Sequence, residues 1–312
     1  MINSGGGRSL RSARRRSVLA LAIVIRFCPA VRLLSLMARR VVSLWVRLCL
    51  GRPTMIFRKA ASIAIAVLFA FAAGDARAID FYEIQIYPTE TAPLGHLQLE
   101  LHSNSVTTAT GVEAHEQIVP YQIHETLEAT YGILGWGEIG QYFATARLDN
   151  GNYEYAGSRT KFHFGIPQTM DWPVSFGGNL ELDYMRRAAE ENPMTLEMRP
   201  IAETHIGHLT VIGNFAFEKP FSGPGTHKGV TFDPSGEVEY DRLLWWLSPA
   251  LEYYGDIGAL AALPPVESQQ HFIVPALNFN LLDGLELNLG VGLGLTRASN
   301  GTFVKTIVGW TF

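Results

Sequence analysis

Residues 301–312 of the chain read GTFVKTIVGWTF, and this stretch decides the fold. When side chains alternate, one face carries mostly apolar and aromatic residues: Val304, Thr306, Val308, Trp310 and Phe312. The other face holds Lys305, Gly309 and Thr311, with Ile307 as its one apolar exception. Alternation at every second residue predicts a β-strand, because successive side chains of a strand point to opposite faces.

The same alternation recurs upstream. Residues 96–102 (HLQLELH) put three leucines on one face, and residues 179–184 (NLELDY) and 285–290 (LELNLG) alternate without a break. Segments of this length suit tilted membrane strands, and bacterial barrels usually have an even number of them. We therefore expect an all-β, antiparallel, up-and-down transmembrane β-barrel of about twelve strands, at 95–103, 119–131, 136–148, 153–164, 174–187, 194–205, 208–219, 229–242, 247–257, 268–280, 284–297 and 301–312.

The connections between these segments alternate in length. If the chain starts in the periplasm, the inner turns are tight (132–135, 205–208 and 281–284) and outer loops are longer (103–118, 219–228 and 258–269). Aromatic residues near the inner strand ends predict an interfacial girdle: Trp136, Trp172, Trp245, Trp246, Tyr253 and Tyr254. A strand that ends in Trp310 and Phe312 resembles the insertion signal of outer-membrane barrels.

The first quarter of the chain differs in charge from the rest. Residues 1–54 carry eleven arginines and no acid, whereas residues 79–312 carry 11 Lys and Arg against 28 Asp and Glu. Residues 55–78 predict a cleavable signal peptide, with Arg58-Lys59, an apolar stretch and the small-x-small site at Ala76 and Ala78. The basic 1–54 extension then suggests a start codon placed too early, with a membrane-surface helix as the alternative. Both cysteines, Cys28 and Cys49, precede the predicted cleavage site.

These features predict export to the outer membrane of a Gram-negative bacterium. Residues 79–94 are expected to form a periplasmic or rim segment before a barrel spanning 95–312. The implied partners are outer-membrane lipid and lipopolysaccharide, the export and insertion machinery, and a small solute, with no role for nucleic acid.

If the leucine-bearing faces contact lipid, the opposite faces line the lumen. The selectivity candidates on that face are Glu100, Glu128, Arg159, Lys161, Glu181, Asp183, Glu197, Arg199, Glu203, Glu237, Glu239, Glu252, Glu286 and Lys305. With Glu218 and Asp241, twelve acids face four bases. An acidic lumen favours cations, although a hydrated network of ion pairs filling a medium barrel explains the same residues. Gly290, Gly292 and Gly294 share this inward face, where a missing side chain allows another group to approach closely.

Other functions are less well supported by the residues. The pairs His205/His208 and His96/His102 imply no third ligand by their spacing, so no metal site and no cofactor are expected. The nearest match to an outer-membrane hydrolase is His102-Ser103-Asn104, whose spacing and lumen-facing histidine do not fit a lipid-facing nucleophile. The chain is therefore not expected to be an enzyme. A plugged or structural barrel whose loops bind a partner stays open as the alternative to a channel.

Several pieces in order resemble a family of outer-membrane barrels that are labelled transporters or phenol meta-degradation pathway proteins: residues 83–87, 99–104, 130–133, 199–201, 252–255 and 290–296. The resemblance spans nearly all of residues 79–312. It implies an outer-membrane barrel with a transporter-like role.

Overall fold

The computed structural model describes residues 80–108, 123–147, 152–167, 172–299 and 301–312. All of them belong to one compact unit, Phe71–Phe312. The predicted extension (1–54) and the signal peptide with Ala76 and Ala78 lie outside the described residues. No helix in the described ranges combines the length and the apolar character needed to cross a membrane.

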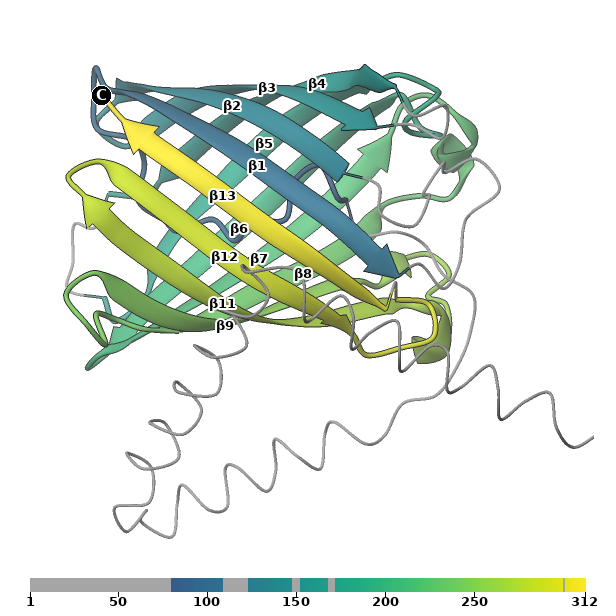
Figure 1. The fold of residues 1–312 in the computed structure, drawn as a ribbon. Helices are drawn as coiled ribbons and strands as arrows, with labels where there is room; N and C mark the ends of the chain where they lie inside the picture. Colours follow the sequence, from purple (N-terminus) through teal and green to yellow (C-terminus); the bar gives the residue numbers. More distant parts are fainter. Residues whose placement is uncertain (1–79, 109–122, 148–151, 168–171, 300) are drawn as a thin grey trace, which may run out of the picture. The chain divides into compact units, whose positions relative to one another are not determined.

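Twelve long antiparallel strands close into a single barrel (Figure 1). They are β1 (Leu97–Thr108), β2 (Ile123–Leu134), β3 (Gly137–Arg147), β4 (Tyr153–Gly165), β5 (Ser175–Met185), β6 (Met194–Ile206), β7 (Leu209–Pro220), β8 (Thr231–Tyr240), β9 (Leu247–Asp256), β11 (Gln270–Leu282), β12 (Leu285–Gly294) and β13 (Thr302–Thr311). A two-residue strand, β10 (Gly258–Ala259), pairs antiparallel with the start of β8, and two short 3₁₀ helices, η1 (Pro224–His227) and η2 (Val266–Ser268), lie in connections. Each long strand pairs with the next, and β13 pairs with β1. The predicted up-and-down barrel is confirmed.

The predicted strand limits are close to the observed ones, with one clear error at β1. The expected outer loop began at Ser103, whereas β1 continues to Thr108. Residues 103–105 look like loop residues because they are polar and small. They stay in the sheet because Asn104 pairs with Lys305 on β13 and with His124 on β2, which leaves its side chain on the inward face.

Exposed apolar side chains cover the outward face of the barrel. Leu101, Leu127 and Phe143 are neighbours in register on β1, β2 and β3, and 44%, 47% and 49% of their surface is exposed. The same holds around the wall for Leu180, Leu182, Met198, Phe215, Val238, Leu251, Leu293, Val304 and Val308. A continuous apolar belt of this size is a surface made for lipid, since soluble proteins rarely expose one.

The two ends of the barrel differ. At one end, which we call the short-turn end, β1 begins, β13 ends, and β2–β3, β6–β7 and β11–β12 are joined by two residues each. The connections at the other end, the long-loop end, include η1, β10 and η2.

Exposed tryptophans gather at the short-turn end, as the sequence predicts. They are Trp136 and Trp172, Trp245 with 78% of its surface exposed, and Trp310, which stacks on Phe312. Tyr253 and Tyr254 were wrongly included in this girdle. They lie in the far half of β9, and Tyr254 is buried inside the barrel with its hydroxyl donating to Glu252.

Glycine on β12 permits tight packing inside the wall. A Cβ atom placed on Gly292 would lie only 2.2 Å from the ring of Phe303, and one on Gly290 would lie 2.8 Å from Val274. The predicted close approach at these glycines is therefore observed: the neighbouring strands β13 and β11 send large side chains across β12.

Candidate functional site: the barrel lumen

Residues 80–93, here called the lumen segment, run through the inside of the barrel before β1 begins (Figure 1). Their side chains and backbone contact β1, β3, β4, β6, β7 and β13, which together surround them. Pro88 and Pro93 lack a backbone N–H, so the segment cannot pair as an ordinary strand. Only Leu94, just past it, forms an isolated bridge, with Gly132 of β2.

Apolar side chains hold the half of the lumen segment nearest the long loops. Phe81 and Ile84 are 3% and 0% exposed, and they pack in one cluster with inward side chains of four strands: Val106, Tyr254, Phe272, Val274 and Phe303. The rings of Phe81 and Phe303 meet edge to face with their centroids 5.8 Å apart. In this half of the lumen, Phe81 and Ile84 of the segment therefore belong to an apolar core that they share with the wall.

Polar side chains of the wall satisfy the backbone of the segment further along. Asn214 of β7 accepts from Tyr87 N at 2.8 Å and donates to Tyr87 O at 2.9 Å, a pairing that imitates a β-ladder. Glu203 of β6 accepts from the backbone N–H and the hydroxyl of Thr89 at 2.7 and 2.9 Å. Glu138 of β3 accepts from the N–H of Ala92. The segment thus descends from the long-loop half to the short-turn end.

This arrangement differs from the sequence prediction of a periplasmic or rim segment at 79–94. Within that range the last residues reach the short-turn rim, where Leu94 forms its bridge with Gly132. The reason is physical: the segment carries its own apolar residues at three-residue spacing, and inward apolar residues of the wall provide the surface that buries them.

All four predicted inward bases lie in the lumen and each is paired. Arg159 binds Asp80 and Glu83 of the lumen segment, and its Nε lies 3.2 Å from Asp183. The other three ion pairs are Lys161–Glu128 at 2.7 Å, Arg199–Glu197 at 2.6 Å and Lys305–Glu252 at 2.6 Å. Burial of a charge requires such a partner, and here each cation has one.

The predicted inward acids also lie on the lumen face, and they outnumber the bases. Glu100, Glu128, Glu181, Glu197, Glu203 and Glu252 are buried. On β8, Glu237 and Glu239 are half-buried, and Asn278 donates to Glu239. Glu286 shares the inward face of β12 with Asn288, which bonds Glu252, but it stays exposed near the short-turn end. Among the described residues, the predicted acids that form no ion pair with lysine or arginine lie on several strands: Glu100 on β1, Glu181 on β5, Glu203 on β6, Glu237 and Glu239 on β8, and Glu286 on β12.

Sequence reasoning missed several lumen residues. Glu138, Tyr142 and His163 are buried on the inward faces of β3 and β4, and Tyr142 shares a hydrogen bond of 2.9 Å with Tyr87. Strict alternation from Lys161 and Gly140 would have found them. The inward apolar residues Val106, Phe272, Val274 and Phe303 carry no such signal, because a lumen is expected to be polar.

The hydrolase-like string gains no support from the geometry. His102 is buried on the inward face of β1, whereas Ser103 belongs to the alternate, outward face of the same strand. The two side chains therefore point to opposite sides of the wall and cannot form a nucleophile–base pair.

Comparisons with known proteins find distant likeness among solved structures. No family model matches the chain. No curated protein matches it either. A solved structure titled "KdgM porin" is 9% identical over 69% of this chain and 99% of that chain, with a TM-score of 0.49. A "NanC porin" structure is 8% identical over 69% and 98%, with a TM-score of 0.47. Likeness at this level carries no argument about the function of this chain.

Proposed function

We propose that this chain is an outer-membrane channel for small solutes whose lumen segment closes it at rest, and which prefers cations when open. The observation that carries the proposal is the position of residues 80–93: they lie inside the lumen, and the strands around them form a closed wall. The apolar belt and the tryptophan girdle support a place in the outer membrane, with lipid and lipopolysaccharide as neighbours.

The inner apolar cluster supports a closed resting state. Val106, Phe272, Val274 and Phe303 would face water in an open pore, and exposing a large apolar side chain costs about 1.5–3 kcal/mol. Phe81 and Ile84 cover these side chains, so the closed arrangement is the more stable one.

The way the segment is held supports movement. It is bound by side chains and contributes no strand to the sheet, so it can leave without breaking the ladder of the wall. Its ties at the short-turn half are hydrogen bonds to single side chains such as Asn214 and Glu203. Such bonds are each worth about 0.5–1.5 kcal/mol, or about 1.5–3 kcal/mol to a charged group.

The charge balance supports cation preference. Each of the four predicted lumen bases pairs with an acid, and the acids without such a pair include Glu203 on β6 and Glu237 and Glu239 on β8. When a path opens beside these strands, their carboxylates attract cations and repel anions.

The test is planar-bilayer conductance of the protein purified from the membrane, with cysteines at positions 89 and 203. Thr89 Oγ1 lies 2.9 Å from Glu203 Oε2, so Thr89→Cys with Glu203→Cys allows a short thiol-to-thiol crosslink. Conductance steps that vanish on crosslinking, but that both single-cysteine controls still show, support a mobile closing segment. Steps that persist after complete crosslinking contradict the closing role.

A plugged, structural barrel is the second candidate, and the many ties of the lumen segment favour it. A folded barrel that never conducts, with or without the crosslink, would select this reading over the channel.

A further inference from the structure

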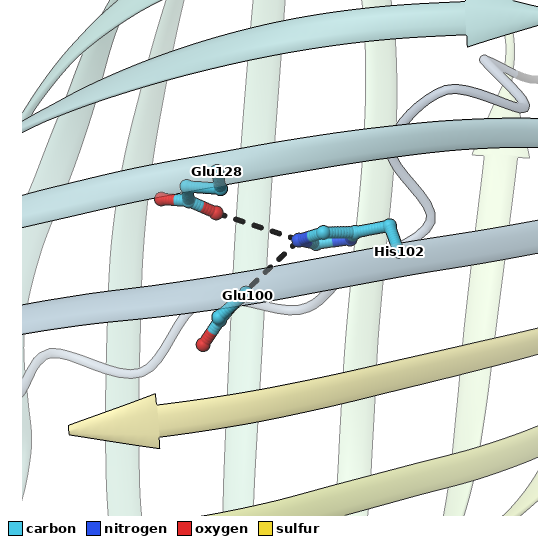
Figure 2. A group of neighbouring side chains, drawn as sticks. All are labelled: Glu100, His102 and Glu128. Carbon is cyan, nitrogen blue, oxygen red and sulfur yellow. Dashed lines mark ion pairs between the residues drawn. The ribbon is translucent and has the colours of Figure 1, made fainter.

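Three side chains of β1 and β2 converge inside the barrel beside the lumen segment: Glu100, His102 and Glu128 (Figure 2). Glu100 and His102 are two residues apart on β1 and so share its inward face. The antiparallel register places Glu128 directly opposite Glu100. Neither residue spacing nor composition reveals this group, because the third member comes from the neighbouring strand.

The geometry within the group suits a metal ion. His102 Nε2 lies 3.3 Å from Glu100 Oε2 and 3.4 Å from Glu128 Oε2, and Figure 2 shows the imidazole aimed between the two carboxylates. Zinc binds nitrogen and oxygen at about 2.0–2.2 Å in a tetrahedron, whose ligand atoms are about 3.4 Å apart. Both nitrogen–oxygen distances match this spacing, and the three ligand atoms all lie within 4.8 Å of one another.

Burial gives an independent reason to expect a ligand. His102 is 0% exposed, and in the described part of the chain its Nδ1 has no hydrogen-bond partner, while its Nε2 meets the two carboxylates only as ion-pair neighbours at 3.3 and 3.4 Å. Glu128 Oε2, the oxygen that faces His102, has none either. Buried polar atoms nearly always form hydrogen bonds, so His102 Nε2 and Glu128 Oε2, which face each other at 3.4 Å without one, are consistent with an ion held between them.

Neighbouring groups hold the carboxylates in place. Lys161 donates to Glu128 Oε1 at 2.7 Å and Gln98 donates to Glu100 Oε1 at 2.7 Å, so each carboxylate turns its other oxygen toward His102. Gln85 of the lumen segment donates a longer hydrogen bond, 3.3 Å, to Glu100 Oε2. This oxygen has a second lone pair, which stays available for a metal ion. Such outer contacts are what orient ligands in metal sites.

We propose that Glu100, His102 and Glu128 bind one divalent transition-metal ion of the zinc class. One imidazole and two carboxylates suit such an ion, whereas calcium takes six to eight oxygen ligands. Three protein ligands leave one position of the tetrahedron for water. The site stands on the wall of the barrel and does not depend on the channel function.

The experiment uses the full protein purified from membranes and stripped with a chelator, then titrated with Co²⁺ and Zn²⁺. Visible absorption of Co²⁺ reports tetrahedral geometry, and X-ray absorption of bound Zn²⁺ reports its ligand atoms. The variants are His102→Gln and Glu128→Gln. The matched control is His205→Gln, because His205 Nε2 also lies near a carboxylate, 3.4 Å from Glu203 Oε1, but its side chain is 60% exposed.

We expect one equivalent of metal with nitrogen and oxygen ligands, bound at least about tenfold more weakly in His102→Gln and Glu128→Gln and equally well in His205→Gln. Folding of each variant is checked by gel mobility before and after heating, and Glu100→Gln replaces any variant that does not fold. Absence of a stoichiometric metal in the unaltered protein overturns the proposal. Binding that survives His102→Gln overturns it too, and His102 would then be an imidazolium held by two carboxylates.

Discussion

At the scale of single residues, buried Lys305 shows how the lumen balances charge. Its ammonium lies 2.6 Å from Glu252, donates to Tyr254 Oη at 3.0 Å and to Ile84 O at 3.2 Å, and is 1% exposed. The Tyr254 hydroxyl in turn donates to Glu252 at 2.8 Å. The base therefore links β13 and β9 to the lumen segment.

Replacing Lys305 by methionine should lower the free energy of unfolding by about 3–5 kcal/mol, because Glu252 is left buried without its partner. The double variant with Glu252→Gln should recover much of that loss. The measurement is the midpoint of urea unfolding in detergent or lipid. Equal losses in the single and the double variant would show that the ion pair contributes little.

Gly292 offers a second residue-scale prediction. A Cβ atom at this position meets the Phe303 ring at 2.2 Å, so Gly292→Ala should destabilise the barrel by about 1–3 kcal/mol through overpacking. Gly135→Ala is the control, because a Cβ there meets nothing within 4 Å. Thermal unfolding followed by gel mobility compares the two, and similar midpoints would contradict the close packing at Phe303.

Alternation within each strand made the inward position of single residues predictable. Lys161, Glu181 and Lys305 lie in the lumen because a phenylalanine, leucine or valine next to each occupies the opposite face. Alternation does not predict which inward residues of neighbouring strands contact one another. The pairing of Glu100 with Glu128 depends on the register between β1 and β2, and the loop that sets it offers no turn signal from which register can be counted.

At the scale of elements, the lumen segment is the part that sequence reasoning misplaced. Residues 83–86 alternate as in a strand, but residues 80–93 do not join the sheet, and Pro88 and Pro93 lack the N–H that a ladder uses. Their place depends on Phe272, Val274 and Phe303, which come from strands almost two hundred residues away or more. Such a contact leaves no local pattern, whereas every one of the twelve strands does.

Cysteine accessibility tests this placement directly, because residues 79–312 contain no cysteine of their own. Ile84→Cys should react with a membrane-impermeant thiol reagent at least about a hundredfold more slowly than Val266→Cys, since Ile84 is 0% exposed and Val266 is 37% exposed in an end loop. The rates are measured on the folded protein in vesicles. Comparable rates at the two positions would mean that the segment does not fill the lumen.

At the scale of the whole molecule, the outward belt should decide whether the barrel enters a bilayer. An arginine at Leu127, in the middle of the Leu101–Leu127–Phe143 patch, should cost about 2–4 kcal/mol of stability in lipid. Leu263→Arg, in the β10–β11 connection, should cost almost nothing. Folding into vesicles, titrated with urea, measures both. Equal costs would argue against lipid contact at the belt.

The lumen charge makes a second prediction at this scale. Glu237→Gln with Glu239→Gln should reduce the cation-to-anion permeability ratio severalfold, because a charge about 4 Å from an ion in water is worth about 1 kcal/mol. Glu267→Gln, in the end loop, is the control. Reversal potentials in unequal KCl supply the ratio. An unchanged ratio in the double variant would remove the role of β8 in selectivity.

The pairing of β13 with β1 has a consequence for assembly. The lumen segment directly precedes β1, yet it lies inside a wall that is complete only when β13 reaches β1. Either residues 80–93 settle against Phe272 and Phe303 before the seam forms, or they must later thread through one mouth of a finished cylinder. The first order requires no passage through a closed ring. On that route the seam is the last contact to form, and it closes over a segment that is already packed against β11 and β13.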